Sequence, residues 1–183
     1  MLKTRLNMIL RYLDWVLLRN TNKYSTMSLL THIAQHLIDV HEGDNWTEVN
    51  IKSTLHDLTY EQAALVTPFS PNSIAMLVHH LAFYNEVVQQ RLLGTYPPIP
   101  PSNGFDVPVL NSEGQWQELQ QKLFDSARSL ANSILHYSED KLFEMPSTGY
   151  NVPYKFLHGL TEHAHYHLGQ MVILKNWHRS RKH

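Results

Sequence analysis

Apolar residues recur every three or four positions along most of this chain, and this period restricts its fold more than any other feature. One stripe in residues 28–41 consists of Leu30, Ile33, Leu37 and Val40. The same period predicts three further long helices, at residues 72–93, 112–137 and 153–177. No segment alternates between apolar and polar residues strongly enough to require a β-sheet. We therefore predict an all-α fold in which each helix buries one face.

The ends of the first two helices carry recognisable signals. Gly43 follows the first helix as a stop, and Ser70 and Pro71 supply an N-cap and a first-turn proline for the second. Two short helical pieces, near residues 53–58 and 59–66, are expected between them. The first two long helices are therefore separated by a segment with local helical structure of its own.

The longest connection lies between the second and third long helices. Residues 96–108 contain five of the nine prolines, which excludes regular structure and fits a crossover loop over the surface. Four long helices with one long crossover connection describe a four-helix bundle, and facing side chains build metal sites in the interior of such bundles. We expect the bundle at residues 27–178, an N-terminal helical extension at 1–26 and a basic tail at 179–183.

Composition excludes several classes of function. The 15 lysines and arginines against 16 acidic residues give a net charge of −1, so no nucleic-acid partner is expected. The absence of cysteine excludes disulfides, zinc–thiolate sites and a cysteine nucleophile. Arg11 and Asp14 interrupt the apolar residues near the N-terminus, which leaves no stretch long enough for a secretory signal or a membrane span. We therefore expect a cytoplasmic protein with no membrane partner. The extension is expected to pack on the domain or on another protein; the alternatives are a helix at a membrane surface, and Met27 as the functional start.

Histidines are conspicuous in this chain, which has 13 of them, and three lie within residues 163–167. His163 and His167 are four residues apart, so they project from one face of the last helix, close enough to share a metal ion. The apolar stripe that they continue contains Phe156, Leu160, Met171 and Leu174. Either ring alone is typical of a hydrogen-bonded core residue, but two on one buried face need separate polar partners. A rival site on the nearly opposite face would consist of His158, Glu162 and His165.

A metal ion here needs a third protein ligand, and the second long helix offers His79 and His80. His80 shares an apolar stripe with Met76, Phe83 and Val87, whereas His79 lies on a more polar face, so His80 is the better candidate. Three neutral imidazoles leave a coordination position open, as catalytic sites do. They do not distinguish Zn, Ni, Fe and Mn.

The remaining histidines have weaker claims on a site. His32 and His36 form another pair spaced by four residues, on the edge of the apolar stripe of the first helix, and His36 is kept as a candidate near the site. The histidines expected at the surface are His41, His56, His136, His178 and His183.

Three segments carry a family pattern. Residues 163–170, HAHYHLGQ, consist of a histidine, three residues including a tyrosine, a second histidine, one further residue, glycine and glutamine. Residues 73–91 place a histidine before Leu-Ala in a helix, and residues 43–46 form a Gly-x-x-Trp turn. Over about residues 27–177, the chain thereby resembles the DinB/YfiT-like superfamily of metal-binding four-helix bundles.

The resemblance implies a metal triad of His80, His163 and His167, the same residues that the helix stripes favour. It also implies that Gly169 permits close helix packing. Residues expected beside the metal or the substrate are Gln170, Tyr166, Trp46 and His36. Members of the superfamily include S-transferases and isomerases that use low-molecular-weight thiols.

The leading hypothesis is a metal-dependent S-transferase or hydrolase. A divalent ion would activate a low-molecular-weight thiol or water for attack on a small electrophilic substrate. No general base is placed by the sequence. The alternatives are a non-catalytic metal- or small-ligand-binding bundle, such as a stress-related dimer, and an interaction module with incidental histidines. A second copy of this chain, in a homodimer, is the expected protein partner.

Overall fold

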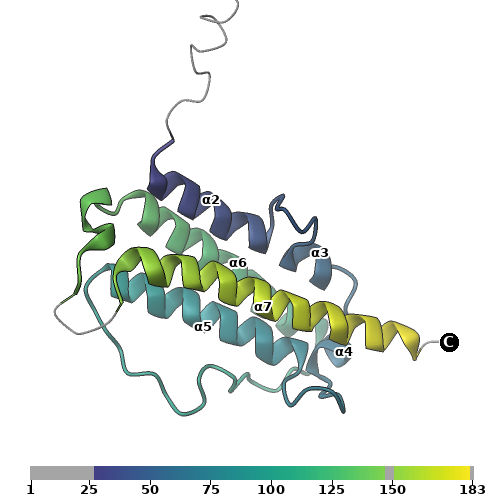
Figure 1. The fold of residues 1–183 in the computed structure, drawn as a ribbon. Helices are drawn as coiled ribbons and strands as arrows, with labels where there is room; N and C mark the ends of the chain where they lie inside the picture. Colours follow the sequence, from purple (N-terminus) through teal and green to yellow (C-terminus); the bar gives the residue numbers. More distant parts are fainter. Residues whose placement is uncertain (1–26, 147–150, 182–183) are drawn as a thin grey trace, which may run out of the picture.

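The computed structural model describes residues 27–146 and 151–181, and these ranges contain helices and loops but no β-strand (Figure 1). The elements in chain order are α2 (Leu29–His41), α3 (Ile51–Leu55), α4 (Tyr60–Ala64), α5 (Ile74–Leu92), α6 (Glu113–Leu135), the 3-10 helix η1 (Glu139–Phe143) and α7 (Pro153–Ser180). The predicted all-α fold is confirmed. The predicted N-terminal extension, residues 1–26, lies outside the described residues.

The four long helices lie side by side as a bundle (Figure 1). Helix α6 packs against α2 and α5, and α7 packs against the same two helices from the other side. The short helices α3 and α4 lie near one end of the bundle, where α3 contacts α7 and α4 contacts α5 and α6. The long connection between α5 and α6 runs along the outside of the bundle, as the concentration of prolines predicts.

Local side-chain caps explain where the helices begin. The Ser28 hydroxyl accepts a hydrogen bond from the Thr31 backbone at 3.2 Å and starts α2 as predicted. The predicted cap of α5 is wrong, because Ser73 rather than Ser70 accepts the backbone N–H of Met76, at 3.2 Å. Ser70 instead bonds to the backbone of Asn72 in the preceding turn. A second cap-forming serine only three residues away therefore moves the start of α5.

Helix α7 is longer than its pattern predicts. It begins with Pro153 in the first turn, as expected, but it continues to Ser180. Arg179 and Lys175, on successive turns, both pair with the carboxylate of Asp57 after α3, and the Arg179 contact measures 2.7 Å. The first residues of the expected basic tail are thus helical and tie the end of α7 to the rest of the bundle.

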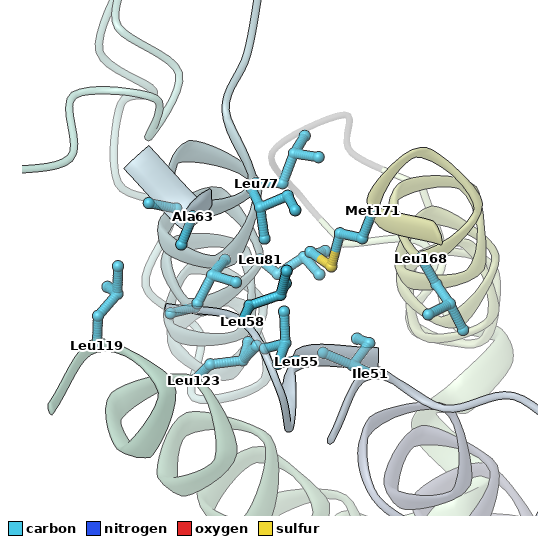
Figure 2. Packing of buried hydrophobic residues seen from close by; sticks show 14 of the residues in the cluster. Ile51, Leu55, Leu58, Ala63, Leu77, Leu81, Leu119, Leu123, Leu168 and Met171 are labelled. Atoms are coloured by element: carbon cyan, nitrogen blue, oxygen red, sulfur yellow. The ribbon is translucent and has the colours of Figure 1, made fainter. Parts of the chain in front are cut away.

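Two groups of buried apolar side chains fill the interior. The group in Figure 2 joins Leu77 and Leu81 of α5 to Leu123 of α6 and Met171 of α7. Ile51, Leu55 and Leu58 close this group from the side of the short helices. The second group lies toward the other end of the bundle and includes Leu37, Leu130, Ile134 and Leu157. Because both α5 and α7 are anchored by buried residues, polar side chains between them occupy defined positions.

Candidate metal centre

Three histidine rings from α5 and α7 meet inside the bundle. The Nε2 atom of His163 lies 2.9 Å from Nε2 of His80 and 2.9 Å from Nε2 of His167. Within the described residues, these three form the one group of metal-ligating side chains with ligand atoms all within 4.8 Å of one another. His80 and His167 are buried, and His163 is half-buried. Nitrogen ligands of one tetrahedral zinc ion lie about 3.3 Å apart, so the observed spacing suits a shared ion.

The outer nitrogens of two rings fix which atoms face the centre. His80 Nδ1 lies 2.6 Å from the backbone oxygen of Asn103, and His167 Nδ1 lies 2.7 Å from the side-chain oxygen of Gln170. An oxygen acceptor requires a proton on each Nδ1, so the neutral rings present lone pairs at Nε2. A proton on Nε2 of His163 can be donated to Nε2 of His80 or to Nε2 of His167, but not to both with good geometry. Three converging nitrogens with at most one proton form an electron-rich centre, which a cation suits.

Burial also keeps these rings neutral. It lowers the pKa of His80 to about 4. Burial, followed by the positive charge that His167 and His80 would carry, lowers the pKa of His163 to about 4. The pKa of His167 is lowered by burial as well. At neutral pH the three rings are therefore uncharged, so no imidazolium proton competes with a metal ion.

The crossover loop holds the α5 side of the centre. The backbone oxygens of Asn103 and Gly104 accept from His80 and His79, and the Asn103 side chain accepts from the Tyr84 hydroxyl at 2.6 Å. Phe105 stacks on the His80 ring with centroids 4.0 Å apart and planes 9° apart. The loop thereby fixes both the direction of His80 Nδ1 and the plane of its ring.

Close approach of this loop depends on an unusual backbone. Asn103 and Gly104 have φ values of 52° and 74°, in the left-handed region. A Cβ atom on Gly104 would lie 2.7 Å from the Phe83 ring, so no other residue fits without a shift. Asn103, Gly104 and Phe105 are not among the residues predicted near the site. The Asn-Gly dipeptide inside the proline-rich segment was the available signal, because this pair favours positive φ.

The other residues expected near the metal lie at different distances from the triad. Gln170 contacts His167, as described, whereas Tyr166 is 64% exposed and its ring lies 5.0 Å from that of His167. Trp46 is fully exposed in the loop after α2, so it does not line the buried centre. His36 is exposed and approaches His165, with ring centroids 5.9 Å apart, rather than the triad. The structure therefore brings Gln170 to the triad and leaves His36 and Trp46 outside it.

Three expectations about other residues are corrected. His41 and His178, expected at the surface, are 1% and 6% exposed. Gly169 does not mediate close helix packing, because a Cβ atom there would meet nothing within 4 Å. Among the described residues, the rival set of His158, Glu162 and His165 does not form a group with ligand atoms close enough for one ion. Of its members, His165 approaches His36 of α2, and Glu162 is exposed.

Comparison with known families agrees with this geometry. The family model of the DinB superfamily matches residues 44–171, which is more than half of the chain. The chain belongs to the DinB superfamily. The match includes α5, the crossover loop and the part of α7 that carries His163 and His167. Searches of curated proteins and of solved structures found no match.

Membership in the DinB superfamily and the buried histidine triad together fit a metal-binding protein. Zinc and other divalent transition metals accept imidazole nitrogen, and three such ligands leave room for another group. Among the described helices, none combines the length and the apolar character needed to cross a membrane.

Proposed function

We propose that this DinB superfamily protein is a metal-dependent enzyme, an S-transferase or a hydrolase, with His80, His163 and His167 as the ligands of a divalent ion. The substrate is a small electrophile, and the nucleophile is a low-molecular-weight thiol or water. When bound, such an ion lowers the pKa of a thiol or water that it coordinates, and so supplies a nucleophile at neutral pH. Zn, Ni, Fe and Mn all suit three imidazoles.

The convergence of three Nε2 atoms carries this proposal. Neutral rings supply at most one proton for the two 2.9 Å contacts, so one of these contacts brings two lone pairs together unless a positive charge lies between them. A purely structural histidine has a donor or acceptor opposite each nitrogen. The triad lacks that complementarity among its inner nitrogens, which favours a bound ion over a hydrogen-bonded core.

The surrounding residues prepare the ligands rather than react. Asn103 and Gln170 hold the protons of His80 and His167 on the outer nitrogens, so both inner nitrogens face the ion. Phe105 covers one face of His80 and keeps bulk water from it. Tyr84 has its ring centroid 5.1 Å from that of His163, and its hydroxyl donates to Asn103, which links the loop to the ligand set.

The test is metal content in protein purified without a polyhistidine tag. Wild type is expected to hold about one ion per chain, and His163→Ala is expected to hold almost none. His165→Ala is the matched control, because it removes a ring two residues away whose Nδ1 bonds to the Thr161 backbone at 3.1 Å. Equal metal in the His163→Ala and wild-type proteins would rule out the triad as the metal site.

Catalysis is tested separately on the metal-loaded protein. A panel of small electrophiles is offered with a thiol and with water alone, and wild type is compared with His163→Ala. Turnover that disappears in His163→Ala supports the enzyme. Metal binding without turnover on any substrate would favour the non-catalytic bundle instead.

A homodimer and a cytoplasmic location belong to the same proposal. Support for the dimer comes from Leu65, Val66 and Phe69, which are 47%, 53% and 72% exposed after α4. The Phe69 ring lies 6.3 Å from Trp177, so these apolar groups gather beside the C-terminal part of α7. Sedimentation of wild type and Phe69→Glu tests the dimer, and a wild type that stays monomeric contradicts it. Cell fractionation tests the location.

A further inference from the structure

A cavity of about 370 Å³ lies between α5 and α7 and reaches His163. Its volume falls within the range of small-molecule sites, about 300–1,000 Å³. Tyr84 and His163 line it near the triad, and Arg91 and Lys155 line its other end. The two helices run antiparallel here, because the end of α5 meets the start of α7 (Figure 1). The cavity therefore extends from the candidate metal centre along the groove between them.

The lining of this cavity is positively charged. It includes Arg91 and Lys155 but no aspartate or glutamate. Other cavities of the described structure differ, such as the one beside α6, whose lining contains Glu86, Glu118 and Asp125. The whole chain has a net charge of −1, so a groove with two cations and no carboxylate is not a consequence of overall charge.

The spacing along the helices sets the size of a matching ligand. Lys155 precedes His163 by eight residues, which is about 12 Å along a helix axis. The long side chains of Arg91 and Lys155 shorten the gap that a ligand must bridge. A molecule with one end at the triad and the other at these cations is thus several bonds long, and it carries its charge far from its reacting group.

We propose that this groove binds a carboxylate-bearing small molecule, with the carboxylate at Arg91 and Lys155 and the reacting end at the triad. The proposal rests on the proposed function and names its substrate class. Arginine offers paired N–H donors that match a carboxylate, and Lys155 adds a second, more exposed charge. The carboxylate belongs either to the thiol or to the electrophile, and probe molecules separate these two sources.

The binding experiment uses three probes on zinc-loaded, full-length protein. Reduced glutathione carries a thiol and two carboxylates, S-methylglutathione carries the carboxylates without a free thiol, and 2-mercaptoethanol carries a thiol alone. Saturable binding is expected for the first two by calorimetry, and weaker binding for 2-mercaptoethanol, which has only its thiol to contact the ion. Tighter binding of glutathione than of S-methylglutathione assigns the carboxylate to the thiol, and equal binding assigns it to the electrophile. Absence of saturable binding for both carboxylate probes at millimolar concentration overturns the proposal.

Variants at the charged end test the position of the carboxylate. Arg91→Gln is expected to weaken the binding of S-methylglutathione about tenfold, and the exposed Lys155→Gln by less. Lys122→Gln is the charge-matched control, since Lys122 lies on α6 and pairs with Glu86 at 3.3 Å. Affinities unchanged within twofold in both Arg91→Gln and Lys155→Gln contradict the proposal.

A steric variant tests the same groove without removing charge. Gly159 lines the cavity on α7, and a Cβ atom there meets nothing within 4 Å, so we expect Gly159→Leu to fold and to fill the groove. It is expected to weaken binding of S-methylglutathione more than tenfold. Gly169→Leu, on the exposed side of the same helix, adds the same side chain outside the cavity and is expected to leave binding unchanged. Equal binding in wild type and Gly159→Leu overturns the proposal.

Metal content of the same samples separates this proposal from the proposed function. The cations act without the ion, so weak binding of S-methylglutathione that depends on Arg91 is expected in metal-free protein too. Metal retained by His163→Ala defeats the triad and leaves this result intact. Normal metal content with no dependence on Arg91, Lys155 or Gly159 defeats the groove and leaves the triad intact.

Discussion

Two of the places where the bundle buries histidine rings satisfy those rings in opposite ways. His41 Nδ1 donates to the Leu37 backbone at 2.8 Å, and its Nε2 faces the Asn85 amide at 3.4 Å. Asn85 also donates to Ser126 at 3.0 Å, and Ser126 donates to the Leu123 backbone. Every ring nitrogen there has a complementary protein group. In the triad, the outer nitrogens of His80 and His167 have such partners but the inner nitrogens face one another.

The contrast distinguishes a structural histidine, whose ring nitrogens both bond to protein groups, from candidate metal ligands, whose inner nitrogens lack such partners. Both places are buried, and burial lowers the pKa of His41 and of His80 to about 4. Burial and a lowered pKa therefore do not distinguish them. Hydrogen-bond complementarity does, because a closed chain of donors and acceptors leaves no coordination site.

The largest expected difference is in the response to metal. Zinc at one thousand times its dissociation constant should raise the free energy of unfolding of wild type by about 4.1 kcal/mol, because the ion binds only the folded state. His80→Ala should show no such gain. Asn85→Ala, which disturbs the other place, should keep the full gain. Thermal unfolding with and without zinc measures all three, and an equal gain in His80→Ala would remove the distinction.

The pH response should reveal His41. Its folded pKa of about 4 is below the unfolded value, so the unfolded state binds more protons between about pH 4 and 6.5. Stability contributed by the neutral ring is therefore present above about pH 6.5 and is lost as the pH falls toward 4, by up to about 3 kcal/mol. Urea unfolding over this range should show a shallower pH slope in His41→Gln than in wild type. Identical slopes would mean that His41 does not titrate on unfolding.

Removing Asn85, the partner of His41, should lower the free energy of unfolding by less than the loss of zinc binding or the protonation of His41 does. Asn85→Ala leaves the buried Nε2 of His41 and the Ser126 hydroxyl without that amide, which should lower the free energy of unfolding by about 2 kcal/mol. Gln89→Ala is the control one turn along α5, where the amide bonds to Ser129 and Ser133 near the surface. Its loss should be about 0.5 kcal/mol or less. Urea denaturation without metal compares the two, and equal losses would contradict the closed network.

The helix faces of the three histidines could be predicted, because the apolar stripe of a helix is a local property of the sequence. Helix geometry alone assigns His163 and His167 to the stripe of Met171, and His80 rather than His79 to the interior, where the structure has them. The same logic fails for His41, at the last residue of α2, because its burial depends on Asn85 and Ser126 of other helices. Stripe patterns describe one helix and not its neighbours.

The contact between the crossover loop and His80 could not be predicted from the sequence for a different reason. The path of residues 96–108 is set by where α5 and α6 pack, so no local pattern predicts that Asn103 reaches His80. The start of α5 shows the same limit at smaller scale, since Ser70 and Ser73 are both cap-forming residues and the structure uses Ser73. Only the Asn103-Gly104 pair could be recognised in the sequence of this loop, because it is a local signal for a backbone with positive φ.

The smallest expected effect tests whether that loop belongs to the centre. Gly104→Ala places a methyl group 2.7 Å from the Phe83 ring and should push the loop away from His80, weakening metal affinity about tenfold. Gly94→Ala is the matched control, because Gly94 has a similar φ of 84° but a Cβ atom there meets nothing within 4 Å. Both variants bear a similar backbone strain, and Gly104→Ala adds the contact with Phe83. Competition with a zinc chelator isolates the difference. If affinity falls equally in both, strain explains it; if it falls in Gly104→Ala alone, the loop orients His80.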